Sequence, residues 1–126
     1  MNVTMYLYPK CGTCRKAKKY MTEHGVELNE IHIAENPPSK ETLEDLIEKS
    51  GLPIKKFFNT SGKKYRELGL SQKLKDMSQN EQVELLASDG MLIKRPIVTD
   101  GKWVTVGFKE EEFADVWIKQ TAHNDR

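Results

Sequence analysis

Both cysteines of this chain stand in one short motif, Cys11-Gly12-Thr13-Cys14. Before the motif, the alternating β-branched and aromatic run Val3–Tyr8 predicts a strand, and after it the pattern predicts a helix from about Gly12 to His24. The motif therefore lies where a strand turns into a helix, with both thiols at the helix N-terminus. Unpaired N–H groups and the positive end of the helix dipole stabilise a thiolate there and lower a thiol pKa.

Other uses of a Cys-x-x-Cys pair fit this chain less well. A structural zinc site needs two further ligands, and the three histidines, His24, His32 and His123, are not spaced as a pair. A structural disulfide would close a very short loop and remove little unfolded-state entropy. Two buried, inert cysteines remain an alternative, because free cysteine is commonly buried. We interpret the pair as a reactive dithiol.

The two thiols are expected to differ in access. Cys14 shares a helix face with Ala17 and Met21, whereas Cys11 precedes that face and should project from the loop. We therefore expect Cys14 to be the more buried thiol. Four cationic residues follow at once and add positive charge: Arg15, Lys16, Lys18 and Lys19.

The bulk composition excludes several other classes of function. The chain has 126 residues, which suits one domain, and 20 Lys+Arg against 19 Asp+Glu give a net charge of +1. Neither nucleic acid nor an anionic membrane is indicated as a partner. No basic, then apolar, leader follows Met1, and no apolar run approaches membrane-spanning length. We expect a cytoplasmic monomer, since a reactive dithiol suits a reducing compartment.

The remaining pattern predicts the order β-α-β, a helical block, then β-β-α. A second strand is predicted at Glu27–Ile33, followed by a helix capped by Ser39 and by short helices within 54–77 that are interrupted at Thr60-Ser61-Gly62. A further helix is opened by the capping box Ser78-Gln79-Asn80-Glu81 and closed by Asp89-Gly90, and a hairpin of Arg95–Thr99 and Trp103–Val106 turns at Asp100-Gly101. A last helix contains Phe113, Val116 and Trp117, and a frayed tail is expected from His123 to Arg126. This order predicts an α/β, thioredoxin-like fold in a single domain over 1–126. Its core would span about 1–36 and 90–120, with an all-helical insertion at about 37–89.

Pro96 lies at the entry of the third predicted strand. A cis Arg95-Pro96 bond would turn a backbone edge toward the cysteine motif. An ordinary trans proline at the first position of a strand is equally compatible with the sequence. Both alternatives stay open at this point.

Four blocks together resemble the arsenate reductase-related family of thioredoxin-fold proteins, which includes ArsC reductases and the Spx/MgsR regulators. The blocks are Tyr8-Pro9-Lys10-Cys11-Gly12-Thr13-Cys14-Arg15-Lys16-Ala17, Tyr65-Arg66-Glu67-Leu68-Gly69-Leu70, Leu92-Ile93-Lys94-Arg95-Pro96-Ile97-Val98, and Val106-Gly107-Phe108-Lys109-Glu110-Glu111-Glu112. The resemblance covers essentially the whole chain.

For the ArsC reductases, the resemblance implies a cysteine that attacks arsenate and three arginines that hold the oxyanion. Cys11 and Arg95 match two of these four positions. Leu52–Lys64 contains no arginine for the middle position, and neither arginine nor lysine stands at Gly107-Phe108 for the third. Lysine does not reproduce the planar, bidentate fork of arginine. Arsenate reduction is therefore the weaker alternative.

For the Spx/MgsR branch, the resemblance implies a redox switch in a protein that binds the C-terminal domain of the RNA polymerase α-subunit. The Cys-x-x-Cys pair and the Val106–Glu112 block match this branch. Gly51 falls near a glycine that contributes to the polymerase contact there, and a plain helix cap is the alternative for it. That branch typically carries an arginine where this chain has Ser61.

The leading hypothesis is a thiol–disulfide redox protein of the ArsC/Spx type. Cys11 would be the nucleophile and Cys14 would resolve the mixed disulfide. Arg95 would hold anionic sulfur or a glutathione carboxylate, while Pro96, Gly12 and Thr13 would form the docking edge. No metal or resident cofactor is expected, and glutathione, glutaredoxin or thioredoxin would supply electrons. The alternatives are the RNA polymerase-binding regulator and the arsenate reductase.

Overall fold

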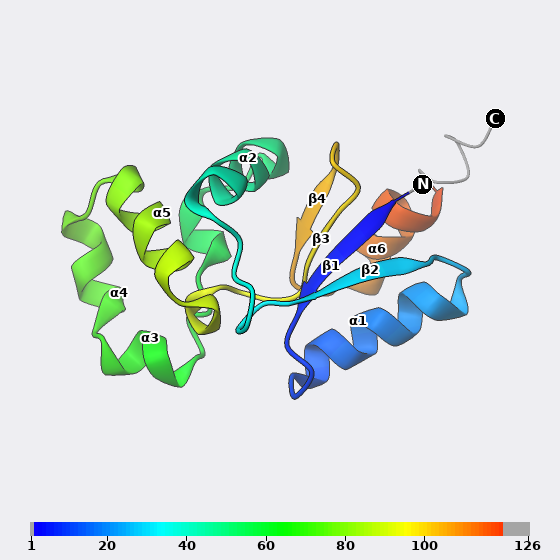
Figure 1. Ribbon diagram of the computed structural model, residues 1–126, viewed down its shortest axis with the longest axis horizontal. Coiled ribbons are helices and arrows are strands. Elements are labelled where there is room, and N and C mark those ends of the chain that lie inside the picture. Colours follow the sequence, from blue (N-terminus) through cyan, green and yellow to red (C-terminus); the bar gives the residue numbers. More distant parts are fainter. Residues whose placement is uncertain (1, 120–126) are drawn as a thin grey trace. The chain divides into compact units, whose positions relative to one another are not determined.

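The computed structural model describes residues 2–119, which form two compact units (Figure 1). Unit 1 comprises the chain up to Ile31 and from Arg95 onward, and unit 2 spans His32–Lys94. The tail expected from His123 lies outside the described residues. No helix in the described part is long and apolar enough to cross a membrane.

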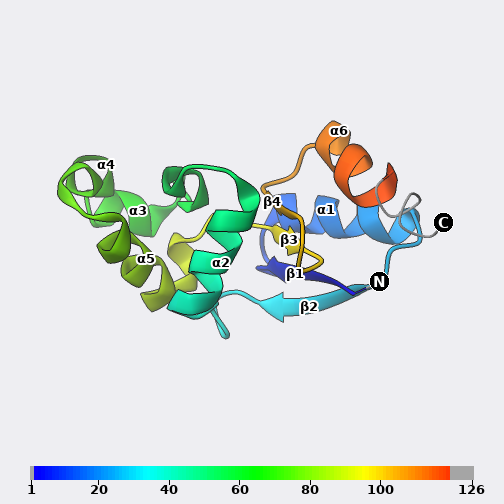
Figure 2. The same cartoon turned by 90° about the horizontal axis from the view of Figure 1, so that it is seen from above.

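Unit 1 is built on a mixed sheet with the strand order β2-β1-β3-β4. The strands are β1 (Val3–Leu7), β2 (Leu28–His32), β3 (Ile97–Thr99) and β4 (Val104–Val106). Strand β3 is antiparallel to both neighbours, with Val98 opposite Met5 and Thr105. Strands β1 and β2 run in the same direction (Figure 2). The predicted thioredoxin-like α/β class is confirmed, although all four strands are shorter than the sequence predicted.

Two helical segments pack against the same residues of β1. Helix α1 (Gly12–Glu23) begins directly after the cysteine loop, and α6 (Glu110–Phe113) continues with wider turns as η4 (Ala114–Lys119). The shared core contains Val3, Met5, Leu7, Cys14, Ala17, Met21, Val98, Phe113 and Trp117. The Trp117 Nε1–H donates a 3.0 Å hydrogen bond to Thr105 Oγ1, which satisfies the buried polar atom of the indole.

Unit 2 is helical. Its elements are α2 (Lys40–Ser50), η1 (Ile54–Phe57), α3 (Lys63–Glu67), α4 (Leu70–Lys73), η2 (Leu74–Asp76), α5 (Gln79–Ser88) and η3 (Gly90–Leu92). The Ser39 cap is confirmed, since its Oγ accepts from the Thr42 N–H at 3.2 Å. The capping box is confirmed in both directions, with Ser78 Oγ at 3.1 Å from the Glu81 N and Glu81 Oε1 at 2.9 Å from the Ser78 N.

Gly90 was predicted from the sequence to close a helix, but the structure requires a glycine there because two backbone segments approach each other closely. Helix α5 ends at Ser88, as expected, but Gly90 starts η3 and has no left-handed conformation. A Cβ at Gly90 would collide with the Ile33 carbonyl group, with the Ile33 carbonyl carbon only 2.7 Å away. The glycine therefore serves a close approach of two backbone segments within unit 2.

Candidate functional site

The two thiols take the positions that the strand-to-helix turn gives them. Cys11 is the N-cap of α1 in extended conformation, and its N–H donates a 2.9 Å hydrogen bond to the Tyr8 carbonyl. Cys14 lies one turn later on the buried face of α1 with Ala17 and Met21. Both thiols are free, with Cys11 partly exposed and Cys14 fully buried, which agrees with the expected difference in access.

The surroundings of Cys11 favour its thiolate. Partial burial alone would raise the pKa of Cys11, but the net shift is downward. The backbone N–H and the thiol of Cys14 lie close enough to favour the anion, although the Cys11 side chain forms no conventional capping hydrogen bond. The Arg95 guanidinium adds a hydrogen bond and coulombic attraction. Cys11 is therefore the thiol that is poised to act as a nucleophile.

Cys14 is shifted in the opposite direction. Burial is the largest cause of a pKa of about 12 for Cys14, and the hydrogen bond and charge of the neighbouring Cys11 act in the same direction. The Tyr8 N–H donates to Cys14 Sγ at 3.5 Å and opposes this shift, as does the Arg95 charge. Cys14 therefore keeps its proton at a pH at which Cys11 has already lost its own.

Arg95 carries unused hydrogen-bonding capacity beside Cys11. Its Nε and Nη1 are buried and have no hydrogen-bond partner in the described residues. Its guanidinium carbon lies 5.1 Å from the centroid of the Tyr8 ring, a cation–π contact that holds the side chain. Buried donors without an acceptor are costly, so this arrangement suits an anionic group that binds next to the thiolate.

Tyr8 belongs to the site, although no role was predicted for it from the sequence. It serves three of the contacts above, because its carbonyl, its N–H and its ring reach Cys11, Cys14 and Arg95 respectively. Its position at the end of the predicted strand, three residues before the first cysteine, was the available signal.

Of the remaining candidate residues, Pro96, Gly12 and Thr13 belong to unit 1 and Gly51 belongs to unit 2. Pro96 is buried, its bond to Arg95 is cis, and its carbonyl accepts from the Gly107 N–H at 2.9 Å. Gly12 and Thr13 are exposed at the start of α1. Gly51 belongs to unit 2, where it is the left-handed C-cap of α2 with φ 69°. Within the described residues, no three His, Cys, Asp or Glu side chains gather as metal ligands.

The opposite pKa shifts predict different alkylation behaviour for the two thiols. In a Cys14→Ser variant, Cys11 should react with iodoacetamide with an apparent pKa below that of an ordinary thiol, about 8.5. In a Cys11→Ser variant, Cys14 should react slowly up to at least pH 10, because burial is the largest cause of its raised pKa. Mass spectrometry of timed samples from pH 5 to 10 measures both rates, and denatured Cys11→Ser protein is the control for access. Faster reaction of Cys14 at neutral pH would reverse the two roles.

The fold and the site together define a thioredoxin-like protein with two thiols at the start of its first helix. The chain belongs to the ArsC family, whose model matches residues 6–116. Among solved structures, an ArsC family related protein from Bacteroides fragilis is similar, with a TM-score of 0.88 and 48% identity. That likeness covers 91% of this chain and 97% of the other.

Two curated relatives from Bacillus subtilis strain 168 match nearly the whole chain. The uncharacterized protein YusI is 71% identical over 117 residues, which is 93% of this chain and 99% of YusI. The regulatory protein MgsR is 31% identical over 121 residues, which is 96% of this chain and 94% of MgsR.

Proposed function

We propose that this protein is a thiol–disulfide redox protein that reduces disulfides in the cytoplasm with its Cys11-Cys14 pair. The observation that carries the proposal is the opposite pKa shift of two neighbouring thiols, downward for Cys11 and upward for Cys14. Cys11 is thus the accessible nucleophile, and Cys14 is the buried, protonated thiol that acts in the second step. An inert pair would need neither the shift nor the Arg95 charge beside it.

The reaction begins with attack by the Cys11 thiolate on one sulfur of a disulfide. A bond forms between Cys11 Sγ and that sulfur, the original S–S bond breaks, and the other sulfur leaves as a thiolate that takes a proton from water. The Arg95 donors Nε and Nη1 are available to hold a departing thiolate or a substrate carboxylate such as that of glutathione. Exposed Gly12 and Thr13, with the segment of Pro96, would border the docking edge.

The second step uses Cys14. Its proton goes to solvent, its thiolate attacks Cys11 Sγ, and the bound thiol is released, so two electrons pass from the protein dithiol to the disulfide. The charge and hydrogen bond of Cys11 both raise the pKa of Cys14, although burial is the larger cause. Both contributions disappear once Cys11 is held in a neutral mixed disulfide, which lowers the pKa of Cys14 when its thiolate is needed. Glutathione, glutaredoxin or thioredoxin would restore the dithiol.

A stoichiometric exchange reaction tests this proposal. Reduced protein mixed with 2-hydroxyethyl disulfide should release two equivalents of 2-mercaptoethanol and lose two hydrogens as a monomer, because Cys14 closes the disulfide onto Cys11. Released thiol and intact protein mass report the two products. A lasting adduct on Cys11, or disulfide-linked dimers, would contradict the resolving role of Cys14.

A redox-sensing regulator that binds the RNA polymerase α-subunit is the second candidate. The similarity to the regulatory protein MgsR favours it. The family resemblance assigns Gly51 to the polymerase contact in this candidate function. The C-terminal domain of the α-subunit should be tested for binding to the reduced and the oxidised protein. Under the leading proposal we expect no difference between the two states. Binding that changes with oxidation and is lost in Gly51→Arg, but not in Gly51→Asn, which tolerates the left-handed cap, would favour the regulator.

Arsenate reduction is the weakest of the three candidates. In the described part of unit 1 the arginines are Arg15 and Arg95, and Arg15 is exposed, with its Nη2 at 3.5 Å from the Lys10 carbonyl oxygen. Arg95 alone is left to hold a tetrahedral oxyanion at Cys11. A single bidentate fork leaves much of the charge of such an anion without a charged donor.

A further inference from the structure

Cationic side chains are concentrated directly before and after Cys11 in the sequence of unit 1. Lys18 in this region is paired, because its Nζ lies 3.1 Å from Glu30 Oε1. The other cations here are exposed and form no ion pair with any described residue: they are Lys10, Arg15, Lys16 and Lys19. We call these four residues the basic patch. Four cations without an ion pair outnumber the two glutamates near them, Glu23 and Glu110, so the patch has a positive balance that attracts anionic groups from solution.

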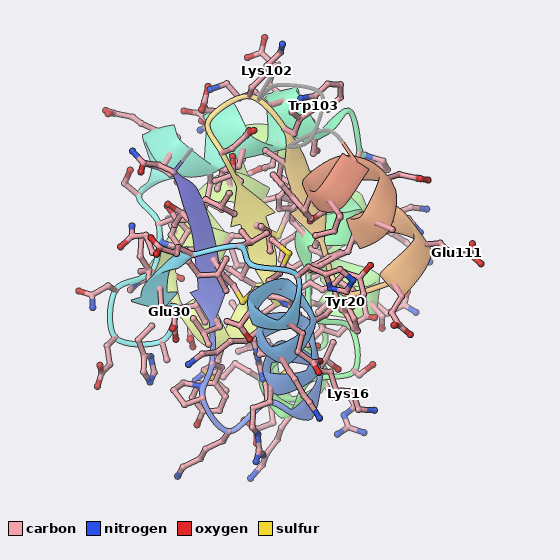
Figure 3. The ribbon with its side chains drawn as sticks, turned by 90° about the vertical axis from the view of Figure 1, so that its right-hand side faces the viewer. Lys16, Tyr20, Glu30, Lys102, Trp103 and Glu111 are labelled. Atoms are coloured by element: carbon pink, nitrogen blue, oxygen red, sulfur yellow. The ribbon has the colours of Figure 1, made fainter. Side chains whose placement is uncertain are left out.

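A groove of about 230 Å³ adjoins the basic patch. It is lined by Lys16, Lys19, Tyr20, Glu23, Phe108 and Glu110. Its aromatic part is fixed by ring contacts, with the Tyr20 and Phe108 centroids 5.7 Å apart and those of Phe108 and Phe113 4.8 Å apart. Tyr20 lies on the side of α1 that faces α6, and Lys16 precedes it on the same helix (Figure 3). The groove therefore joins an aromatic surface to an edge that carries Lys16 and Lys19 on α1, with Glu23 and Glu110 also in the lining.

The spacing along α1 relates this groove to the reactive thiol. Lys16 and Lys19 lie five and eight residues after Cys11, which at 1.5 Å per residue is about 8 and 12 Å along the helix axis. An extended peptide covers about 3.3 Å per residue. A partner whose cysteine reaches Cys11 would thus place its side chains two to four residues away beside these lysines.

We propose that the basic patch and its groove select a disulfide-bearing protein segment with Asp or Glu two to four residues from its reacting cysteine. The carboxylates would lie against Lys16 and Lys19, and an apolar side chain would pack on Tyr20 and Phe108. Glu23, one turn beyond Lys19, and Glu110, at the start of α6, limit the favourable positions of an acidic side chain to the part of the groove next to the two lysines. This inference rests on the proposed disulfide reduction and adds to it the chemical class of the substrate.

Three peptides test the selection. Each peptide carries one cysteine as a mixed disulfide with 2-mercaptoethanol. The positions two to four residues away on both sides of that cysteine are all Asp in the first peptide, all Asn in the second and all Lys in the third. The second-order rate constant with the reduced protein should be about tenfold higher for the Asp peptide than for the Asn peptide at 10 mM salt, and lowest for the Lys peptide. The Asp-to-Asn ratio should fall toward one near 0.5 M salt, where charges are screened.

A charge-reversal pair locates the effect. In Lys16→Glu/Lys19→Glu the Asp-to-Asn ratio should fall below one, whereas Lys55→Glu/Lys56→Glu, which makes the same change in net charge on exposed residues of unit 2, should keep the ratio. Equal loss in both pairs would assign the preference to net charge and overturn the proposal. Equal rates for all peptides, with 2-hydroxyethyl disulfide still reduced, would overturn it and leave the proposed function standing. No reaction with any disulfide would overturn the proposed function, and this inference with it.

Discussion

Replacing Cys11 with serine is expected to lower the rate of disulfide reduction at pH 7 by about a hundredfold or more. The remaining thiol, Cys14, has a pKa of about 12 in the unchanged protein, and burial, the largest cause of that raised pKa, remains in the variant. At pH 7 the thiolate fraction of Cys14 therefore stays below that of an ordinary thiol, which is about one molecule in 30. The stronger intrinsic nucleophilicity of a high-pKa thiolate recovers only part of this deficit. The burial of Cys14 reduces the rate further.

The matched variant Cys14→Ser should behave differently. Its Cys11 should attack 2-hydroxyethyl disulfide in the first step at a rate close to that of the unchanged protein, but the mixed disulfide should persist. Rapid quenching in acid followed by intact mass measurement separates the two variants, since only Cys14→Ser accumulates an adduct. Equal rates of adduct formation in the two variants would show that the two thiols are interchangeable and would contradict the assignment of roles.

Replacing Gly90 with alanine should destabilise the fold by about 3 kcal/mol, near the upper end of the usual cost of overpacking. The added Cβ would meet the backbone of Ile33 and Ala34, and main-chain atoms cannot move aside as a flexible side chain can. Unit 2 would have to shift one of its two backbone segments to make room.

Urea unfolding followed by circular dichroism measures this loss as a lower midpoint with an unchanged slope. Gly12→Ala is the matched control, because a Cβ there meets nothing within 4 Å and the residue lies in a helix. Its stability should stay within about 1 kcal/mol of the unchanged protein. Equal midpoints for Gly90→Ala and Gly12→Ala would show that the close approach to Ile33 is not maintained in solution.

Local signals in the sequence predicted the scaffold of the site. A strand followed by Cys-x-x-Cys and an amphipathic helix places Cys11 at the N-cap and Cys14 in the core, and both positions depend only on neighbours within a few residues. The same holds for the Ser39 cap and the capping box at Ser78. Such elements are predictable because propensity, pattern and capping point to one answer.

Features that depend on distant contacts could not be predicted in this way. The need for glycine at position 90 arises from Ile33, far earlier in the chain, and nothing next to Gly90 in sequence indicates it. Arg95 was assigned to the site, but its stacking on Tyr8 and its unpartnered donors depend on how β3 pairs with β1. The choice between a cis and a trans bond at Pro96 was open in the sequence, and the structure has the cis form.

The burial of Cys14 also bears on how the protein withstands oxidants. A peroxide arriving from solvent meets Cys11 first, since Cys14 is fully buried. Attack by the Cys11 thiolate on one peroxide oxygen would break the O–O bond, release the other oxygen as water or an alcohol, and leave a sulfenic acid. The neighbouring Cys14 thiol would condense with that sulfenic acid, forming a disulfide and releasing water, in competition with further oxidation of Cys11 to the sulfinic acid, which thiols do not reverse. The buried cysteine would thus direct oxidation into a disulfide that a thiol can reduce.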